Sequence, residues 1–172
     1  MSVGIRSIMP KIAVLWVFVA LVSVPSPAQA ASRSPSSRHY AVGSSNAAEA
    51  ALLRGRRIVA AASAQRGKPY RRGAQGPGAF DCSGLSGYAY RSVHIHLPRT
   101  ADQQYRAAHP VGRAAARPGD LVFWVHGRHA YHVAIYAGAG RVWHAPKPGD
   151  RVRLARIWDS GQVRFGRVGA QA

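Results

Sequence analysis

The chain of 172 residues contains little cysteine, few acidic residues and no long apolar run. Cys82 is its single cysteine, so a framework of internal disulfides is excluded. The main apolar run, residues 12–24, has 13 residues and is shorter than the roughly 20 that a membrane-spanning helix needs. These absences exclude a disulfide-stapled scaffold and disfavour a transmembrane protein.

The N-terminal segment has the pattern of an export signal. Arg6 and Lys11 precede the apolar run, prolines at 25 and 27 interrupt it, and small residues lead to Ala30. This order is typical of a cleaved signal peptide, and a membrane anchor is the less favoured alternative. We therefore predict residues 1–30 as a signal peptide, cleavage near Ala30, and a secreted or cell-wall-associated product without a stable membrane anchor.

Acidic residues number only six against 24 lysines and arginines, for a formal charge of +18. Such an excess favours a polyanionic neighbour, which for an exported protein means a cell wall, a membrane surface or extracellular nucleic acid. The arginines are scattered and no nucleic-acid-binding signature accompanies them, so we expect no nucleic-acid partner. The charge is also compatible with a merely solvated surface.

The rest of the chain predicts helices first and strands later. Residues 31–46 are serine-rich and basic, which indicates a disordered lead-in before a domain at 47–172. A helix is expected from the cap Asn46 to a stop at Gly67, and others after the caps Asp81 and Thr100. Short runs rich in valine, isoleucine and aromatic residues then predict strands around 121–125, 132–136, 141–144, 151–157 and 162–168.

This order of elements predicts an α+β fold in which N-terminal helices pack on a five- to six-stranded antiparallel sheet. The predicted domain is long enough to bury a single core without disulfides or metals. We expect it to be a monomer that needs no cofactor.

An unpaired cysteine at the start of a helix is a candidate nucleophile. The free backbone N–H groups and positive dipole end of a helix N-terminus favour a thiolate, and a nearby histidinium would lower the thiol pKa further. Most free cysteines are small buried hydrophobic residues instead, but Asp81 and Ser83 flank Cys82 and argue against an apolar pocket. We therefore expect Cys82 to be reactive.

Two of the eight histidines lie in predicted strands that could form one hairpin. A three-residue loop of Gly138, Ala139 and Gly140 would put His132 and His144 on the same sheet face as diagonal neighbours. A two-residue loop would move one of them to the other face. With the longer loop, His132 could accept the cysteine proton and His144 could orient the ring of His132.

A metal site is the competing interpretation of the histidines. His126, His129 and His132 recur every third residue, but they span a turn running into a strand and no carboxylate accompanies them. We therefore predict no metal.

The chain resembles the NlpC-type family of bacterial cell-wall cysteine peptidases. The resemblance covers about residues 61–168 and rests on the motifs GKPY, FDCSGL, LPRTADQQY, PGDLVFW and HVAIYAGAGRVWHAP, with RV at 151–152. It implies a reduced papain-like fold, a triad of Cys82, His132 and His144, and peptidoglycan and anionic wall polymers as partners. It also implies hydrolysis of stem peptides between γ-linked D-glutamate and a diamino acid such as diaminopimelate.

The resemblance also assigns residues to substrate binding. Tyr70 would help to stabilise the oxyanion, Asp81 and Ser83 would line the pocket for the amino end of the stem peptide, and Arg99 would support that wall or bind a carboxylate. The plainer alternatives are that Asp81 caps the helix, Ser83 satisfies a backbone group and Arg99 forms a structural ion pair.

Two positions depart from the family pattern. Residues 71–74, Arg-Arg-Gly-Ala, replace an aromatic residue and paired glycines, and Ala134 stands where glycine is usual, which could narrow the groove. Two other hypotheses remain open: an amidase or acyltransferase of the same fold, and a non-catalytic cationic wall-binding protein held by its surface charge.

Overall fold

The computed structural model describes residues 35–158 and 161–169, and its side chains from residue 46 onward. The predicted signal peptide lies outside the described residues. The helices are α1 (Pro35–Ser63), α2 (Cys82–Arg91) and α3 (Ala101–Ala107), with a 3-10 turn η1 (Arg113–Ala115). None of the helices within this range is long and apolar enough to cross a membrane.

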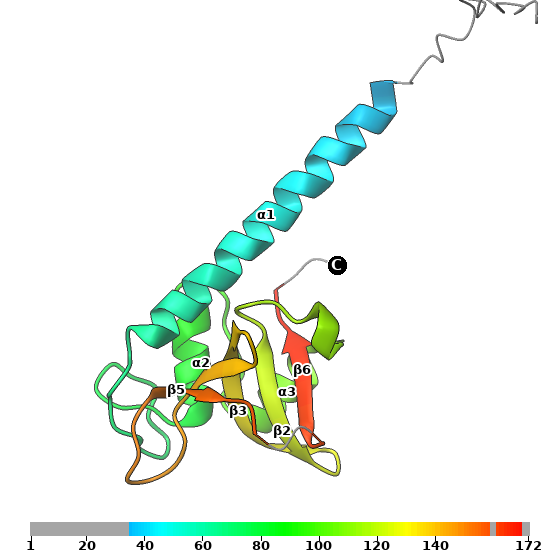
Figure 1. The fold of residues 1–172 in the computed structure, drawn as a ribbon. Coiled ribbons are helices and arrows are strands. Elements are labelled where there is room, and N and C mark those ends of the chain that lie inside the picture. Colours follow the sequence, from blue (N-terminus) through cyan, green and yellow to red (C-terminus); the bar gives the residue numbers. More distant parts are fainter. Residues whose placement is uncertain (1–34, 159–160, 170–172) are drawn as a thin grey trace, which may run out of the picture. The chain divides into compact units, whose positions relative to one another are not determined.

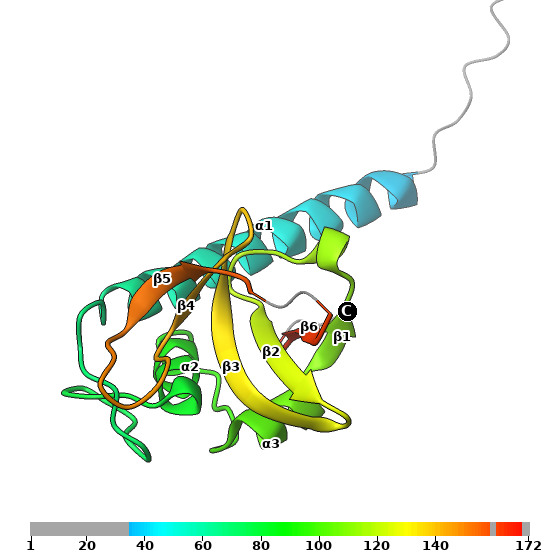
Figure 2. The same ribbon diagram turned by 60° about the horizontal axis from the view of Figure 1, so that its bottom comes forward.

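The strands form one six-stranded antiparallel sheet in the order β1-β6-β2-β3-β4-β5. Both ribbon views show the long β2–β3 hairpin at its centre (Figures 1 and 2). The α+β prediction and the predicted antiparallel sheet are therefore confirmed. The strand bounds are β1 (His109–Val111), β2 (Leu121–His126), β3 (His129–Gly138), β4 (Arg141–His144), β5 (Arg153–Arg156) and β6 (Val163–Arg167).

Local capping signals set the starts of the two short helices. The Asp81 side chain accepts a hydrogen bond from the Gly84 N–H at 2.7 Å, which caps α2. Thr100 and Gln103 form a reciprocal capping box at the start of α3. Each cap satisfies backbone N–H groups that have no partner within the helix, so both predicted starts are confirmed.

Two expectations about element bounds are wrong. The first helix starts at Pro35 rather than at Asn46, so much of the expected disordered lead-in belongs to α1, and it ends at Ser63, before the left-handed turn at Gly67. The second is that the predicted strands omit β1, which begins at His109 and pairs with β6 at Arg167. Both errors arise because tertiary pairing and helix continuation override weak local signals.

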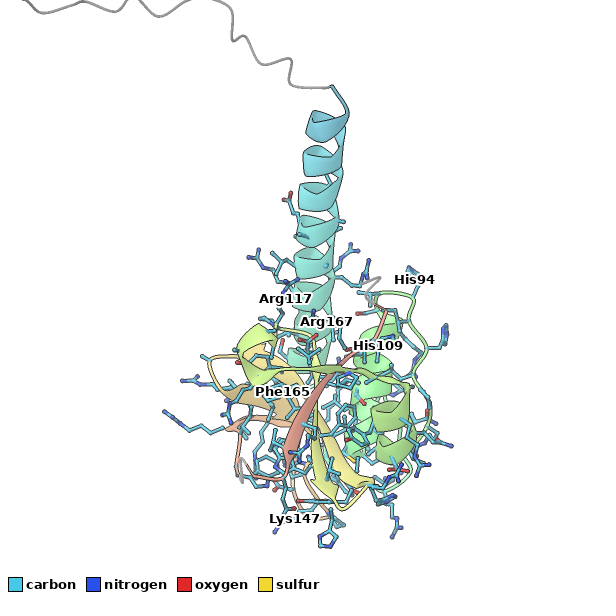
Figure 3. The ribbon with its side chains drawn as sticks, turned by 90° about the vertical axis from the view of Figure 1, so that its right-hand side faces the viewer. His94, His109, Arg117, Lys147, Phe165 and Arg167 are labelled. Atoms are coloured by element: carbon cyan, nitrogen blue, oxygen red, sulfur yellow. The ribbon has the colours of Figure 1, made fainter. Side chains whose placement is uncertain are left out.

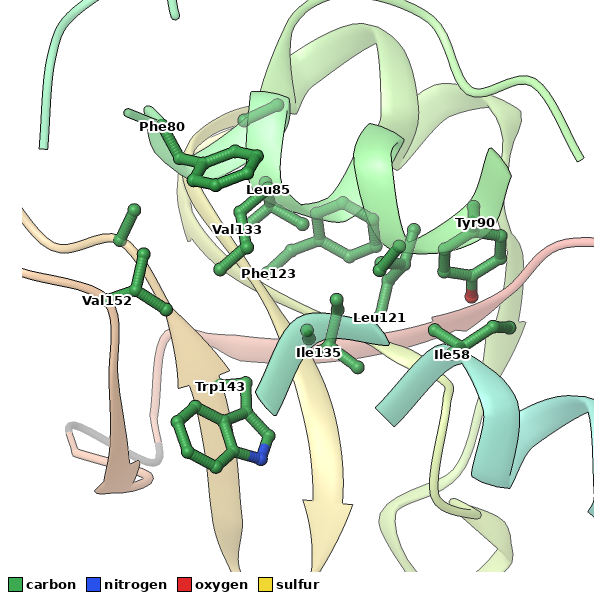
Figure 4. Close-up of a cluster of buried hydrophobic side chains, with 14 of the residues drawn as sticks. Ile58, Phe80, Leu85, Tyr90, Leu121, Phe123, Val133, Ile135, Trp143 and Val152 are labelled. Carbon is green, nitrogen blue, oxygen red and sulfur yellow. The ribbon is translucent and has the colours of Figure 1, made fainter. Parts of the chain in front are cut away.

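The main core lies between the helices and one face of the sheet. Figure 4 shows Leu85 and Tyr90 of α2 facing Val133 and Ile135 of β3, with Ile58 of α1 beside them. These five side chains are at most 3% exposed. Burying their apolar surface fixes α2 against β3 and thereby places the first residue of α2, Cys82, beside that strand.

A second cluster covers the opposite face of the sheet. Val122 and Trp124 of β2, Ala134 of β3 and Val142 of β4 are buried there together. Ala134 is 2% exposed within this cluster, so its methyl group packs in a core rather than narrowing a groove as we had expected. The alternation of residues 132–136 between the two faces follows the predicted period of two.

Candidate active site

Cys82 is the first residue of α2, and its sulfur lies against the main chain of β3. The backbone N–H groups of Val133, Ser83 and Cys82 lie near this sulfur and act to lower the pKa of its thiol. Val133 directly follows His132, so folding joins the head of the helix to the strand that carries the predicted base. Cys82 is partly buried and is a free thiol.

His132 and His144 contact each other directly. His132 Nε2 lies 3.1 Å from His144 Nδ1, and the two rings are nearly perpendicular, at 83°. Both side chains are buried, at 8% and 3% exposure. Because Nε2 of His132 is engaged by His144, its Nδ1 is the nitrogen left to accept a proton from a nucleophile.

The predicted register of this hairpin is right, but the predicted loop is wrong. Gly138 pairs with Arg141, so the turn contains only two residues, Ala139 and Gly140, with φ of 50° and 67°. A bulge between Tyr136 and Gly138 adds one residue to β3.

The bulge restores the register that a two-residue turn alone would lose. Ile135 pairs with Trp143, and the same register places Ala134 opposite His144. Residues opposite each other in a sheet share a face, so His144 lies on the face of His132. The meeting of the two rings therefore depends on this bulge.

Burial sets the protonation of the histidine pair. Burial, together with a smaller effect of the neighbouring His144, lowers the pKa of His132 to about 3. Burial and the positive charge of Arg153 lower the pKa of His144 to about 4, and Asp150 opposes them. Both imidazoles are therefore neutral at neutral pH, and the hydrogen bond between them is one between neutral rings.

The thiol also rests in its neutral form, contrary to our expectation. Burial raises the pKa of Cys82, and the negative charge of Asp81 adds to this, while the Val133 and Ser83 N–H groups oppose it. With His132 neutral, the histidinium that we expected to lower the thiol pKa is absent at rest. The thiolate must therefore form by proton transfer when a substrate is bound.

Asp81, Ser83 and Arg99 form one hydrogen-bonded network beside Cys82, in which Asp81 and Ser83 are buried and Arg99 is partly exposed. Arg99 Nη2 contacts Asp81 Oδ2 at 2.6 Å, and Arg99 Nη1 donates to Ser83 Oγ at 2.9 Å. Burial acts to raise the pKa of Asp81, but hydrogen bonds from Arg99 and from the Gly84 and Gly73 N–H groups hold it below its usual range. The plainer alternatives for Asp81 and Arg99, a helix cap and an ion pair, are thus confirmed; their roles in substrate binding stay predictions.

The unusual loop at 71–74 is held by its main chain. The Gly73 N–H donates to Asp81 Oδ2 at 2.8 Å, and the Asp81 N–H donates to the Ala74 carbonyl at 2.9 Å. The departures at Arg71 and Arg72 leave these contacts unaffected, because they involve backbone atoms of other residues. The two arginine side chains are exposed.

Tyr70 lies at the other end of this loop, next to the cysteine segment. It forms a bridge with the buried Phe80, and its side chain is partly buried against the main core. Burial raises the pKa of Tyr70, and the charges of Cys82 and Asp81 raise it further. Its hydroxyl is therefore protonated at neutral pH and can donate a hydrogen bond to an oxyanion.

Trp158 and Gln104 are site residues that our sequence reasoning missed. The Trp158 ring lies 5.1 Å from the His144 ring and stacks on Trp124 at 4.0 Å between centroids. Gln104 is fully buried and donates to the carbonyls of Ser83 and Pro98 at 3.1 and 2.9 Å. Neither residue has a local signature in the sequence, because each is placed by contacts between segments that are distant in the chain.

The three histidines proposed as a metal alternative have different partners. His129 Nδ1 lies 3.1 Å from Asp102 Oδ1, whereas His132 contacts His144. His126 pairs with His129 across the turn of the β2–β3 hairpin. Within residues 35–158 and 161–169 no group of three side chains is arranged to hold a metal ion.

Comparison with known proteins decides the family. The model of the NlpC/P60 family matches residues 67–163, more than half of the chain and the whole of the site described above. The chain belongs to the NlpC/P60 family.

Individual relatives agree with this assignment. The chain is 42% identical over 115 residues to a probable endopeptidase p60 of Listeria seeligeri, covering 64% of this chain but 22% of that relative. The NlpC/p60 domain of the peptidoglycan hydrolase SagA superposes with a TM-score of 0.62 at 34% identity, covering 66% of this chain and 98% of that domain. This chain thus spans about a fifth of the length of the Listeria relative.

One structural relative has a different role. RipD of Mycobacterium tuberculosis, described as a non-catalytic NlpC/p60 domain protein adapted to peptidoglycan binding, superposes with a TM-score of 0.57 at 28% identity. The match covers 67% of this chain and 97% of RipD. The fold by itself therefore does not decide between cleavage and binding.

Proposed function

We propose that this protein is an exported cysteine endopeptidase that hydrolyses peptidoglycan stem peptides, at the bond between γ-D-glutamate and the diamino acid. The observation that carries the proposal is the hydrogen-bonded pair of His132 on β3 and His144 on β4, with the Cys82 sulfur near the N–H of Val133, the residue after His132. Membership of the NlpC/P60 family and likeness to a peptidoglycan hydrolase support the substrate class.

The proposed reaction begins with proton transfer from the Cys82 thiol to Nδ1 of His132. The resulting sulfur anion attacks the scissile carbonyl carbon, and the new oxyanion accepts a hydrogen bond from the Tyr70 hydroxyl. When the C–N bond breaks, His132 returns its proton to the leaving amine and an acyl thioester on Cys82 remains. Water, deprotonated by His132, then hydrolyses the thioester and restores the thiol.

His144 acts through His132 in this scheme. For Nδ1 of His132 to accept a proton, its Nε2 must carry one and donate it to His144 Nδ1. This hydrogen bond holds His132 in the productive tautomer and orientation. A neutral imidazole stabilises the imidazolium less than a carboxylate would, because it carries no negative charge.

The Asp81–Ser83–Arg99 network would form the wall that receives the amino end of the stem peptide. The ion pair with Arg99 and three backbone or hydroxyl donors fix the Asp81 carboxylate in place. A fixed carboxylate requires little reorganisation to bind a substrate amine.

Export is part of the proposal. The signal peptide predicted at residues 1–30 would deliver the domain to the wall, and the excess of lysine and arginine would hold it near anionic wall polymers. Mass measurement of the secreted protein tests this step, because cleavage near Ala30 gives a defined N-terminus.

Digestion of purified sacculi tests the activity. We expect the wild-type protein to release muropeptides whose new ends map the bond by mass spectrometry, and Cys82→Ala to release none while keeping its circular dichroism spectrum. Unchanged digestion by Cys82→Ala would refute the cysteine mechanism. Different ends would indicate an amidase or acyltransferase.

A non-catalytic wall-binding protein is the second candidate, and the likeness to RipD favours it. It predicts that wild-type protein and Cys82→Ala both bind sacculi equally and that neither releases any fragment. Release of fragments by the wild-type protein but not by Cys82→Ala would support the endopeptidase and exclude the non-catalytic binding protein.

A further inference from the structure

Helix α3 contacts both elements that carry the proposed nucleophile and base. It packs against β3, which carries His132, and it also contacts α2, which begins with Cys82. The Tyr105 ring of α3 lies edge-on to Phe123 of β2, with 5.2 Å between the ring centroids, and Ala101 is buried in the main core. These apolar contacts fix α3 on the sheet. No step of the proposed mechanism uses this helix.

The side chain of Gln104 links α3 to the first turn of α2. It is fully buried, and its Nε2 donates to the carbonyls of Ser83 and Pro98 at 3.1 and 2.9 Å. Its Oε1 accepts a hydrogen bond from the Ser86 hydroxyl at 2.6 Å. Both amide hydrogens and the amide oxygen are therefore used, and the two carbonyl partners define which amide atom is the nitrogen.

Both carbonyls that Gln104 binds belong to residues next to site groups. Ser83 directly follows Cys82 in the chain, and Pro98 directly precedes Arg99. Arg99 in turn donates to the Ser83 hydroxyl at 2.9 Å. The Gln104 amide thus ties together the main chains of two segments whose side chains already meet. It fixes the first turn of α2 and with it the direction in which Cys82 projects.

The side chain of Asp102 links α3 to β3. Its Oδ1 accepts a hydrogen bond from the Ala130 N–H at 3.0 Å. Ala130 lies at a bulge in β3. Trp124 of β2 pairs with His132, but the next residue of β2 pairs with Ala130, so Tyr131 is an extra residue. Asp102 therefore holds β3 at the bulge that immediately precedes the proposed base.

This bulge decides which face of the sheet carries His132. Ala130 and Val133 are both buried in the main core, although residues three apart in a regular strand lie on opposite faces. The extra residue lets both of them face the core and leaves His132 on the opposite face, where it meets His144. A contact that holds the Ala130 N–H therefore also holds the strand segment that presents the base.

The Ala130 N–H is the main partner of the Asp102 carboxylate. Arg106 and His129 also contact it, at 2.7 and 3.1 Å, but their side chains are 70% and 68% exposed. Exposed ion pairs of this kind contribute little, because water screens them. The hydrogen bond from Ala130 has the largest effect on the pKa of Asp102, and it lowers that pKa. The carboxylate therefore serves chiefly to hold β3.

The Asp102 contact lies at the end of the domain that carries the histidine pair. Figure 3 shows Lys147, in the segment that follows His144, at the end of the domain away from Arg117 and Arg167. The turn between β2 and β3 reaches the same end (Figures 1 and 3). The contact is therefore placed to act on the site and not on the far end of the sheet.

We propose that α3 is a brace that sets the separation between the Cys82 sulfur and His132. Gln104 and Asp102 are its positioning residues: one holds the residue after the nucleophile, and the other holds the strand just before the base. Neither touches the substrate or the reacting atoms. This inference rests on the proposed function for its effect on cleavage, but not for its effect on the thiol. A displacement of about 1 Å can lower a rate about a hundredfold, so a small movement at either contact is sufficient.

Cleavage of a soluble stem peptide tests the Asp102 contact. Asp102→Ala should lower kcat about tenfold and leave KM nearly unchanged, because Asp102 contacts no residue of the proposed substrate-binding wall. Asp102→Asn should restore kcat, because its amide oxygen still accepts the Ala130 N–H. Arg106→Gln is the matched control: it removes the ion pair of Asp102, keeps the bond to Ala130, and should retain wild-type kcat.

The same peptide tests the Gln104 contact. Gln104→Met keeps the approximate volume of the side chain and removes its hydrogen bonds to Ser83, Ser86 and Pro98. We expect kcat to fall about tenfold or more, and KM to rise as well, because the segment that carries Arg99 is released. If Gln104→Met does not fold, the three Asp102 and Arg106 variants carry the test. Equal cleavage by Asp102→Ala and Asp102→Asn would overturn the brace.

Alkylation of Cys82 measures the positioning without turnover. Burial raises the pKa of the Cys82 thiol, so loosening the first turn of α2 in Gln104→Met should make alkylation at neutral pH severalfold faster. Ile58→Val is the control for a general loss of stability, because Ile58 is buried in the same core but belongs to α1. Its alkylation rate should equal that of the wild-type protein.

The two measurements separate the brace from the peptidase. If Gln104→Met and Asp102→Ala lose stability but keep the wild-type kcat and alkylation rate, both residues are merely structural and the brace is overturned. If the wild-type protein cleaves no stem peptide while Gln104→Met is still alkylated faster than Ile58→Val, the proposed function fails and the brace stands.

Discussion

At the scale of single residues, the three proposed catalytic groups, Cys82, His132 and His144, are all neutral at rest. Burial lowers the pKa of His132 to about 3 and raises the pKa of the Cys82 thiol. Each shift disfavours the charged form, so the thiolate–imidazolium pair that attacks a substrate is a minor state before binding. Substrate binding must supply the interactions that make it accessible.

The reactivity of Cys82 towards iodoacetamide should show this. Because its pKa is raised, the thiolate fraction at pH 7 is below that of an ordinary cysteine with a pKa near 8.5. We expect the rate of alkylation, followed by mass spectrometry, to rise only at pH values above about 8.5. The same protein in denaturant is the control, and its rate should rise at a lower pH than that of the native protein. Fast alkylation of the native protein at pH 6 would contradict the raised pKa of the Cys82 thiol.

At the scale of secondary-structure elements, a glycine in α2, Gly84, allows the helix to pack closely against the preceding loop. A Cβ at Gly84 would collide with the carbonyl oxygen of Ala74 and would lie 3.0 Å from Asp81 Oδ1. At Gly87, three residues further along the helix, the nearest atom to such a Cβ is Arg91 Nη1 at 3.7 Å, an ordinary contact. The two glycines thus differ in packing although both lie in one helix.

Alanine substitutions at these glycines should have opposite effects on stability. Gly84→Ala should lower the free energy of unfolding by about 1–3 kcal/mol, because the helix must move away from the loop. Gly87→Ala should raise it by about 0.5–1 kcal/mol, because alanine favours the helix. Urea denaturation measures both, and a Gly84→Ala protein as stable as the wild type would refute the close approach.

How much of this architecture could be predicted depends on how local its causes are. The caps at Asp81 and Thr100 were predictable because each side chain bonds to backbone three residues away. The bulge that aligns His144 with His132 was not, because it compensates a turn length that only strand pairing determines. Trp158 escaped prediction for the same reason: its contacts with Trp124 and His144 are made between distant segments.

At the scale of the whole molecule, the two buried histidines make folding depend on pH. Their pKa values of about 3 and 4 in the folded chain lie below the ordinary value near 6.5 that the unfolded chain has. Between these values the unfolded chain binds protons that the folded chain does not. The contribution of the two neutral histidines to the free energy of unfolding is therefore complete above about pH 6.5 and is lost as the pH falls towards 4.

Urea denaturation between pH 7 and pH 4.5 measures this loss. The slope should approach about 1.4 kcal/mol per pH unit for each of the two histidines below their unfolded pKa. His144→Asn removes one of the two titrating groups, so its slope should be shallower by about half, whatever its absolute stability. An equal slope in both proteins would mean that His144 is protonated within the folded chain, and a neutral imidazole could then not be the group that orients His132.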